Sequence, residues 1–211
     1  RKLKKKNCVL ALLLILSTAA FVYSAINLID WQKDNKITND NINDINGQTT
    51  ITTSTQGEAV NSENEPKDSI YWSYMKTDLI NVDFTELKKK NSDTKGWIQV
   101  LGTNINYPVV QTTNNSYYLT HQLDKKKNSA GWVFMDYRNH VEEFDKNTII
   151  YAHGRVNNTM FGSLRKVITD SWYSNPKNYI VRMSTNYENT VWQVFSTYKI
   201  KTTSDYMDIM F

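Results

Sequence analysis

The stretch GWIQVLGTNINYPVVQ, residues 96–111, decides the fold class. It contains two apolar, β-branched runs, at 97–101 and 105–110, separated by turn-forming residues at 102–104. Two such runs around a short polar turn are typical of paired β-strands. Pro108 has no backbone N–H to give to a neighbouring strand, so we expect the second run to lie at an edge or at an irregular position.

Further strands are predicted downstream of this pair. They cover 131–135, 147–152, 179–183 and 190–199, and the polar segment 185–189 is a plausible hairpin turn between the last two. Many short strands with few helices indicate a mainly β fold, either an antiparallel barrel or a sandwich.

Two short helices accompany these strands. Asp83 and Glu86 have the spacing of a capping box, which predicts a helix that runs to about Asn91. The apolar stripe of residues 160–168 predicts a second helix, for which either Asn158 or Thr159 is the expected N-cap.

The excess of positive charge lies at one end of the chain. The 211 residues carry 25 basic and 21 acidic side chains, and five of the basic ones lie in residues 1–6, which leaves 20 against 21. Nucleic-acid-binding proteins usually cluster basic groups on a folded face. This distribution therefore argues against a nucleic-acid partner.

An uncharged apolar segment follows the basic one. Residues 8–29 have no charged side chain and, as a helix, are long enough to cross a bilayer. The basic residues 1–7 precede it and Asp30 follows, so the N-terminus is expected in the cytoplasm. A cleaved signal peptide, with 18–20 as the small-residue cleavage site, is the competing interpretation.

The polar segment after the anchor predicts a stalk. Residues 30–67 are rich in Thr, Asn, Gln, Ser and acidic side chains, without a sustained apolar period. Such a segment buries too little surface to offset its ordering entropy, so we expect a flexible connection. The folded domain is predicted over residues 68–211.

The sequence lacks the motifs that bind metal ions or nucleotides. Cys8 is the single cysteine and lies in the apolar segment, so no intrachain disulfide is possible and its thiol is expected to serve as a small hydrophobe. The sequence has no H-E-x-x-H, C-x-x-C or phosphate-binding glycine loop. We therefore expect no metal and no cofactor, and we interpret Ser163 as a structural residue.

Of the three histidines, His153 has the most informative context. His121 and His140 lie in polar segments and are expected to be ordinary surface residues. His153 ends the apolar run 148–152 and precedes Gly154, where a strand end can present a general acid or base. From these features alone, a structural histidine is still the simpler interpretation.

Several blocks, in this order, resemble the class B sortases, the cysteine transpeptidases of the Gram-positive cell surface. They are GWIQVLGTNINYPVVQ (96–111), YYL (117–119), FMDYRN (134–139), NTIIYAHGRVNNTMF (147–161) and VFSTYKIKTTSDYM (194–207). The resemblance implies a mainly β fold, a sortase-like closed β-barrel with an N-terminal helix and one inserted helix, preceded by a transmembrane helix. It also implies that the last barrel strands are absent from this chain, so that residues 68–211 form an incomplete catalytic domain.

The resemblance assigns roles to four residues. His153 takes the place of the catalytic histidine, with Ala152 where the family usually has Gly. Asn106, Tyr151 and Tyr206 fall at positions that line the substrate groove in this family. For these three, a structural hydrogen bond in a β-sheet is the alternative interpretation.

The catalytic Cys and Arg of the family have no counterpart in these 211 residues. The resemblance places both after Phe211, and Cys8 is unsuited to the task because a lipid environment disfavours a thiolate. The chain by itself is therefore expected to be inactive.

The function implied is thioacyl transfer at the cell surface. A class B sortase cleaves a sorting motif after Thr and attaches the protein to peptidoglycan, so the expected partners are secreted proteins with sorting motifs and a peptidoglycan amine. The protein would be a single-pass membrane protein with its domain outside the cell. The rivals are a non-catalytic, membrane-tethered peptide-binding module of sortase-like fold and a purely structural envelope domain.

Overall fold

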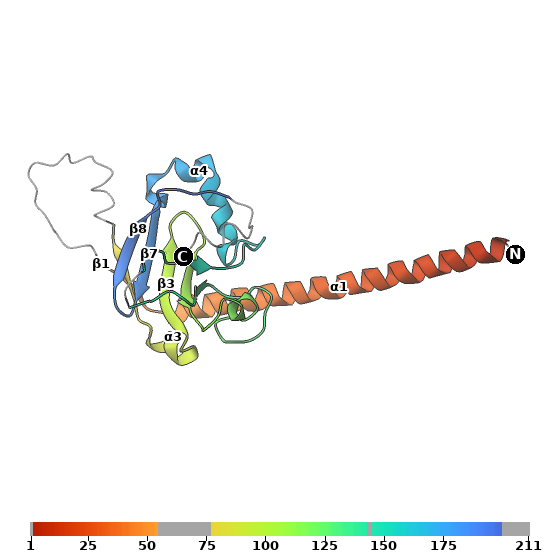
Figure 1. Cartoon of the computed structure of the whole chain (residues 1–211), viewed down its shortest axis with the longest axis horizontal. Coiled ribbons are helices and arrows are strands. Elements are labelled where there is room, and N and C mark those ends of the chain that lie inside the picture. The colour runs from red at the N-terminus through yellow and green to blue at the C-terminus, as the bar shows by residue number, and fades with distance from the viewer. Residues whose placement is uncertain (1, 55–76, 143–144, 200–211) are drawn as a thin grey trace, which may run out of the picture. The chain divides into compact units, whose positions relative to one another are not determined.

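The computed structural model describes residues 2–54, 77–142 and 145–199, and the chain divides into two units, residues 1–40 and 41–211 (Figure 1). Helix α1, Lys2–Gln48, makes up the first unit and continues into the second. In the part of the chain that the structure describes, it alone is long and apolar enough to cross a membrane, with a mean hydropathy of 2.4 and none of the apolar window buried. Length and composition of this kind fit a membrane anchor and a signal sequence equally.

The second unit is built mainly from short strands. Its elements after α1 are β1 (Ile51–Ser54), β2 (Leu79–Val82), α3 (Thr85–Lys90), β3 (Thr94–Val100), β4 (Asn106–Val110), η1 (Tyr117–Leu119), β5 (Phe134–Met135), β6 (Ile150–Tyr151), η2 (Phe161–Ile168), α4 (Asp170–Tyr173), η3 (Pro176–Asn178), β7 (Ile180–Thr185) and β8 (Asn189–Gln193). The prediction of a mainly β fold is confirmed.

The main sheet has six strands in the order β6-β5-β4-β3-β7-β8. All neighbours are antiparallel except β4 and β5, which are parallel and meet at Val110 and Phe134. Strand β3 lies between β4 and β7, and its Trp97 is opposite Pro108 on one side and Ser184 on the other. The hairpin predicted from residues 96–111 is therefore the centre of the sheet.

The sheet is curled into part of a barrel. Ile150 of β6 and Trp192 of β8 belong to opposite edge strands, yet both line one pocket of about 270 Å³ together with Ile98 of β3. Strands β6 and β8 have no further strand partner among the described residues. Closure of the barrel, which the resemblance implies, stays a prediction.

Large aromatic residues fill the core. Trp97 and Trp132 are 0% and 1% exposed, and the Trp132 indole donates to the carbonyl of Pro108 at 3.0 Å. Tyr107 packs edge-on against Trp132, with ring centroids 6.2 Å apart. Pro108 has no backbone N–H, so it leaves no donor unpaired inside the sheet, and its carbonyl is the acceptor for this buried indole.

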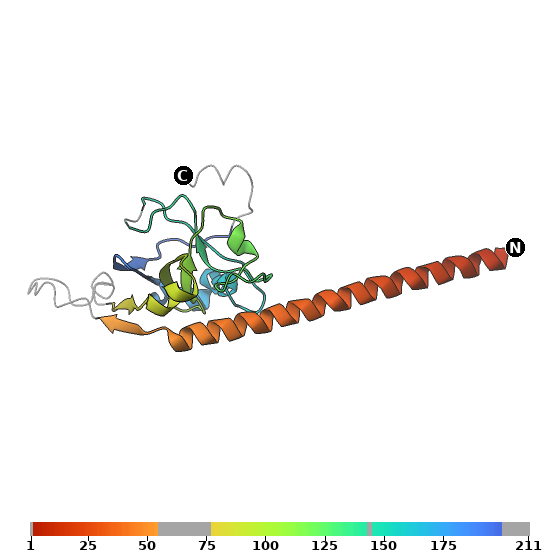
Figure 2. The ribbon, with the colours of Figure 1, turned by 90° about the horizontal axis from the view of Figure 1, so that it is seen from below.

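The stalk prediction is wrong for residues 30–54. Helix α1 runs to Gln48, and β1 follows it and pairs with β2 through Ile51 opposite Val82 (Figure 2). Ile45 is only 2% exposed and Ile42 packs against the core, so these two apolar residues, three apart on one helix face, hold the helix end to the domain. Residues 55–67 of the predicted stalk lie outside the described residues.

The predicted helix caps differ in detail from those observed. Asp83 does accept from the backbone N–H of Thr85 at 2.9 Å, but Glu86 pairs with Lys89 at 2.6 Å instead of reaching back. The N-cap position of α3 is Phe84, whose side chain is buried. The predicted capping box is therefore only half formed.

The second predicted helix is a 3-10 helix that begins after Met160. Met160 has a φ of +50° and no side chain caps the helix. The Thr159 hydroxyl donates to Asn157 at 2.7 Å, which explains why it does not cap the helix. The prediction of Asn158 or Thr159 as N-cap is therefore wrong.

Candidate active site

His153 lies just beyond the C-terminal end of β6. Its ring Nε2 is 2.8 Å from the carbonyl oxygen of Leu119 in η1, and its own carbonyl accepts from the backbone N–H groups of Arg155 and Phe161 at 3.1 and 3.0 Å. A carbonyl oxygen can only accept, so this contact places a proton on Nε2. Nδ1 has no hydrogen-bond partner in the described part of the chain, and this leaves it as the ring atom that can exchange a proton.

The Leu119 carbonyl is held by a tight backbone contact. Gly131 has a φ of +59°, and a Cβ at this position would lie 2.4 Å from the oxygen of Tyr118 and 2.8 Å from that of Leu119. The next residue, Trp132, donates its backbone N–H to Tyr118 at 2.8 Å. Glycine is required here both for the left-handed conformation and for the close approach of the two backbones.

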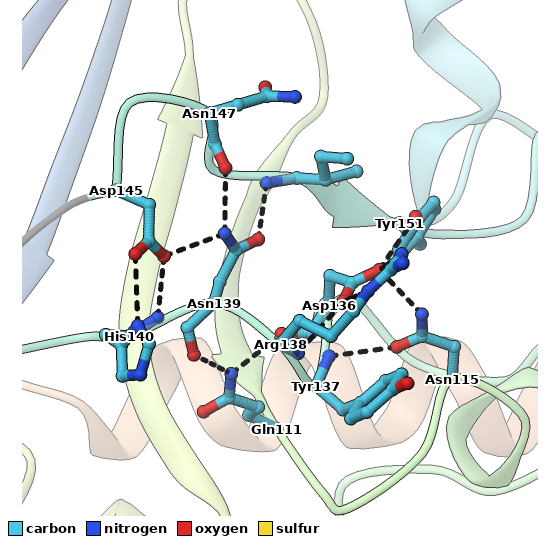
Figure 3. Close-up of polar contacts among 11 residues, drawn as sticks. Gln111, Asn115, Asp136, Tyr137, Arg138, Asn139, His140, Asp145, Asn147 and Tyr151 are labelled. Carbon is cyan, nitrogen blue, oxygen red and sulfur yellow. Dashed lines mark hydrogen bonds and ion pairs between the residues drawn. The ribbon is translucent and has the colours of Figure 1, made fainter. Parts of the chain in front are cut away.

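A buried carboxylate lies at the end of β5, directly after Met135. The Asp136 side chain is completely buried, and its Oδ2 accepts from the Asn115 amide at 2.6 Å and from the Tyr151 hydroxyl at 3.0 Å (Figure 3). Arg138 donates through its backbone N–H and Nε to Oδ1, both at 2.9 Å, and through Nη2 to Oδ2 at 3.0 Å. The charge of this carboxylate is therefore paired and fully hydrogen-bonded, as burial requires.

These contacts control the protonation of both acidic groups. Burial by itself would raise the pKa of Asp136, but the hydrogen bonds from Arg138, Asn115 and Tyr151 outweigh it and hold that pKa well below its usual range. The pKa of the Tyr151 phenol is raised, first by burial and then by the hydrogen bond and the charge of Asp136. At neutral pH the pair is thus a carboxylate and a neutral phenol that donates to it.

A second polar cluster fixes the segment after Arg138. The Asn139 amide donates to Asp145 and to the carbonyl of Asn147, both at 2.8 Å, and its oxygen accepts from the backbone N–H of Ile149 at 2.9 Å (Figure 3). Because Ile149 is hydrogen-bonded to a side chain, β6 is shorter than the predicted run 147–152.

Asp145 also pairs with His140. It accepts from the His140 backbone at 2.8 Å and lies 3.0 Å from the ring Nδ1. The backbone and ring hydrogen bonds of His140 lower the pKa of Asp145 to about 2, and Asp145 in turn raises the pKa of His140 through its hydrogen bond and charge. His140, predicted to be a surface residue, is indeed exposed, but it has this specific partner.

The structure brings together two of the four predicted site residues. Tyr151 and His153 lie two residues apart at the end of β6. The Asn106 oxygen accepts from the buried indole of Trp97 at 2.7 Å, which is the structural hydrogen bond of the alternative interpretation. Tyr206 lies outside the described residues.

Sequence reasoning assigned no role to Asn115, Leu119, Asp136 or Arg138. Asp136 and Arg138 lie in the FMDYRN block, whose closely spaced opposite charges after an apolar pair were the available signal. Leu119 acts through its backbone, which no side-chain pattern reveals. Among the described residues there is no group of three potential metal-ligating side chains.

Known proteins with similar sequences are sortases. No family model matches the chain. Sortase B of Listeria monocytogenes is 36% identical over 137 residues, which cover 61% of this chain and 56% of the relative. Sortase B of Staphylococcus aureus is 37% identical over 128 residues, which cover 61% of this chain and 52% of the relative. The chain thus spans a little over half the length of these curated relatives.

Solved structures give the same result. A crystal structure of S. aureus sortase B matches with a TM-score of 0.55 and 38% identity over 59% of this chain and 58% of that one. A Bacillus anthracis protein described as similar to sortase B matches with a TM-score of 0.51 and 32% identity over 60% of this chain and 65% of that one.

The curled sheet of the second unit is similar to the sheet of solved sortases. More narrowly, the chain is similar in sequence to the class B sortases over about 60% of its length.

Proposed function

We propose that the complete protein is a class B sortase-type cysteine transpeptidase in which His153 is the general acid and base. The observation that supports this most directly is the hydrogen bond between His153 Nε2 and the Leu119 carbonyl. It leaves the other ring nitrogen, Nδ1, able to exchange a proton just beyond the C-terminal end of β6. The similarity to sortase B proteins supplies the reaction class.

The nucleophile and a catalytic arginine would come from sequence outside these 211 residues. A cysteine thiolate would attack the carbonyl carbon of a Thr in the sorting motif, and the new C–S bond would form as the peptide C–N bond breaks. Nδ1 of a doubly protonated His153 would give its proton to the departing amine. The arginine would stabilise the negative charge on the carbonyl oxygen.

The second half of the reaction reverses the proton transfer. A peptidoglycan amine would attack the thioester and pass a proton to Nδ1, and the C–S bond would break to restore the thiolate. The product is a secreted protein joined to peptidoglycan by an amide bond. An anchor at residues 8–29, with the N-terminus in the cytoplasm, would hold the domain where both substrates are presented at the outer face of the membrane.

A non-catalytic peptide-binding module is the second candidate. Such a module would bind the same peptide at the end of β6 without transferring it. Reading the coding sequence beyond Phe211 separates the two candidates. An in-frame cysteine with an arginine downstream supports the enzyme, whereas a stop codon at that point supports the module.

The activity is tested on the complete protein with quenched fluorescent peptides that have a fixed Thr and randomised neighbours. Triglycine is the acceptor, because a sortase B crystal structure has been solved in complex with triglycine. We expect His153→Ala to abolish cleavage and transfer with the fold intact, while His140→Ala, at an exposed histidine outside the site, retains both. Full turnover by His153→Ala would remove His153 from the mechanism.

A further inference from the structure

Two separate segments hold His153, and both are tied to one oxygen atom. The backbone of His153 follows Tyr151, whose hydroxyl donates to Oδ2 of Asp136 at 3.0 Å. The His153 ring is held by Leu119, four residues after Asn115, whose amide donates to the same Oδ2 at 2.6 Å. Tyr151 of the strand and Asn115 of the turn therefore meet at a single buried carboxylate, that of Asp136 (Figure 3).

This carboxylate is itself fixed in position. Arg138, in the turn that follows, donates to Asp136 through its backbone N–H and through Nε and Nη2 of its guanidinium group, at 2.9 to 3.0 Å. The Asn115 side chain is held at both ends, because its oxygen accepts from the backbone N–H of Tyr137 at 3.0 Å. Such a set of charge-assisted hydrogen bonds has a defined geometry, since its donors belong to three residues, Asn115, Arg138 and Tyr151, that are far apart or on different turns of the chain.

We propose that Asp136 is a positioning residue that sets the His153–Leu119 contact by joining β6 to the turn before η1. It touches neither the ring nor the reacting atoms, and it acts through Tyr151 on one side and through Asn115 on the other. Displacement of either segment changes the Nε2–carbonyl distance and with it the direction of Nδ1. Misplacement of a catalytic group by about 1 Å can cost about 100-fold in rate.

The same contact determines what Tyr151 can recognise. The Tyr151 hydroxyl donates its single proton to the Asp136 carboxylate, which is ionised and cannot donate to Tyr151 in return. The phenol oxygen can therefore contact a ligand only as a hydrogen-bond acceptor. A group bound at Tyr151 must therefore be a donor, such as the N–H of an extended peptide or an amine. This step rests on the proposed function, because it places peptide at the end of β6.

The test uses the complete protein with Asp136→Asn and Tyr151→Phe, singly and together. We expect Asp136→Asn to lower kcat about 10- to 100-fold with a smaller change in KM. In the Asp136→Asn background, the added Tyr151→Phe change should cost much less than it does alone, because the two act as one unit. Asp145→Asn is the matched control: it removes the neighbouring carboxylate, which contacts Asn139 and His140 instead, and should leave kcat nearly unchanged.

A spectroscopic measurement keeps the inference separate from the proposed activity. In protein labelled with nitrogen-15 at histidine, the ring signals of His153 should show a proton on Nε2 in the parent chain. They should show mixed tautomers in Asp136→Asn and a smaller change in the same direction in Tyr151→Phe. If Asp136→Asn does not fold, Tyr151→Phe and Asn115→Ala replace it, since each removes one of the two hydrogen bonds to Asp136 Oδ2. Each of them is also expected to give mixed tautomers of the His153 ring.

The ring signals overturn the proposal if those of His153 are unchanged in the folded variants, or if Asp145→Asn changes them equally. A parent protein that has the expected ring signals but no transpeptidation would count against the proposed function alone. Active protein with additive effects of Asp136→Asn and Tyr151→Phe would count against the positioning role alone.

Discussion

The His153 ring and the Leu119 carbonyl are hydrogen-bonded to each other at 2.8 Å, although 34 residues separate them in the sequence. The imidazole is thus oriented by a backbone atom and not by a carboxylate. A backbone carbonyl has no ionisable group, and as an acceptor it favours the neutral form of the ring that has its proton on Nε2. The position of this carbonyl depends on the residues packed against it.

Gly131→Ala should disturb this arrangement. The left-handed backbone alone costs about 1–2 kcal/mol with a side chain present, and the added methyl group would press on the carbonyls of Tyr118 and Leu119. We expect a lower free energy of unfolding, measured by denaturant titration, and a fall in kcat of the complete protein. Gly154→Ala is the control, since nothing lies within 4 Å of a Cβ there. Equal effects of the two changes would show that the carbonyl position is unimportant.

Asn106→Ala should lower stability through Trp97. Its removal leaves the buried indole N–H without its acceptor, which costs about 1–3 kcal/mol. In a Trp97→Phe background the same change should cost less, because no indole N–H then needs a partner. Additive losses of stability would argue against the hydrogen bond as the cause. A rise in KM beyond the loss of stability would support the groove role predicted for Asn106.

Ile45→Ala tests whether the end of α1 belongs to the folded domain. Truncation of a buried Ile to Ala costs about 2–5 kcal/mol, so the thermal midpoint of the domain should fall by several degrees. Asn46→Ala, at the exposed neighbouring position, should stay within about 0.5 kcal/mol of the parent. A midpoint unaffected by Ile45→Ala would restore the flexible stalk predicted for this segment.

The His140–Asp145 pair should give stability a specific pH dependence. The raised pKa of His140 gives a contribution that is complete below its usual value of 6.5 and is lost as pH rises through the raised value. The contribution of Asp145 is complete above its usual 3.8 and is lost as pH falls through about 2. The pair is therefore strongest between these two usual values, near pH 4 to 6.5.

The measurement compares His140→Gln with the parent chain. The difference between their thermal midpoints should be larger at about pH 5 than at about pH 8.5. In Asp145→Asn protein, His140→Gln should produce almost no pH-dependent difference. A midpoint difference that is constant across this range would show that the ion pair does not contribute.

Apolar composition predicted the sheet but not the hydrogen bonds that limit its strands. The apolar runs at 97–101 and 105–110 and the polar turn between them are local features of the sequence, so the two central strands were predicted. Strand β6 is shorter than predicted because Ile149 donates to Asn139, ten residues earlier in the chain. Contacts of this kind depend on the fold as a whole.

A residue of the candidate site could be predicted only where its side-chain chemistry and the resemblance to the sortases pointed to the same position. His153 was found from its place at a strand end and from the match to known blocks. Asp136 was interpreted as part of a solvated connection, which is wrong, because it is buried by donors from Asn115 and Tyr151 that are far away in the sequence. The helical end of α1 was missed because its apolar residues become buried only when the distant core is in place.

Burial of the Asp136 carboxylate also limits how this stretch can diverge over evolutionary time. Only the carboxylate is fully buried, so a single substitution at Asn115, Arg138 or Tyr151 leaves its charge with fewer hydrogen bonds. Replacements there should therefore occur as coordinated pairs. In related proteins we therefore expect the hydrogen-bonded group of Asn115, Asp136, Arg138 and Tyr151 to be retained after most surface residues have changed.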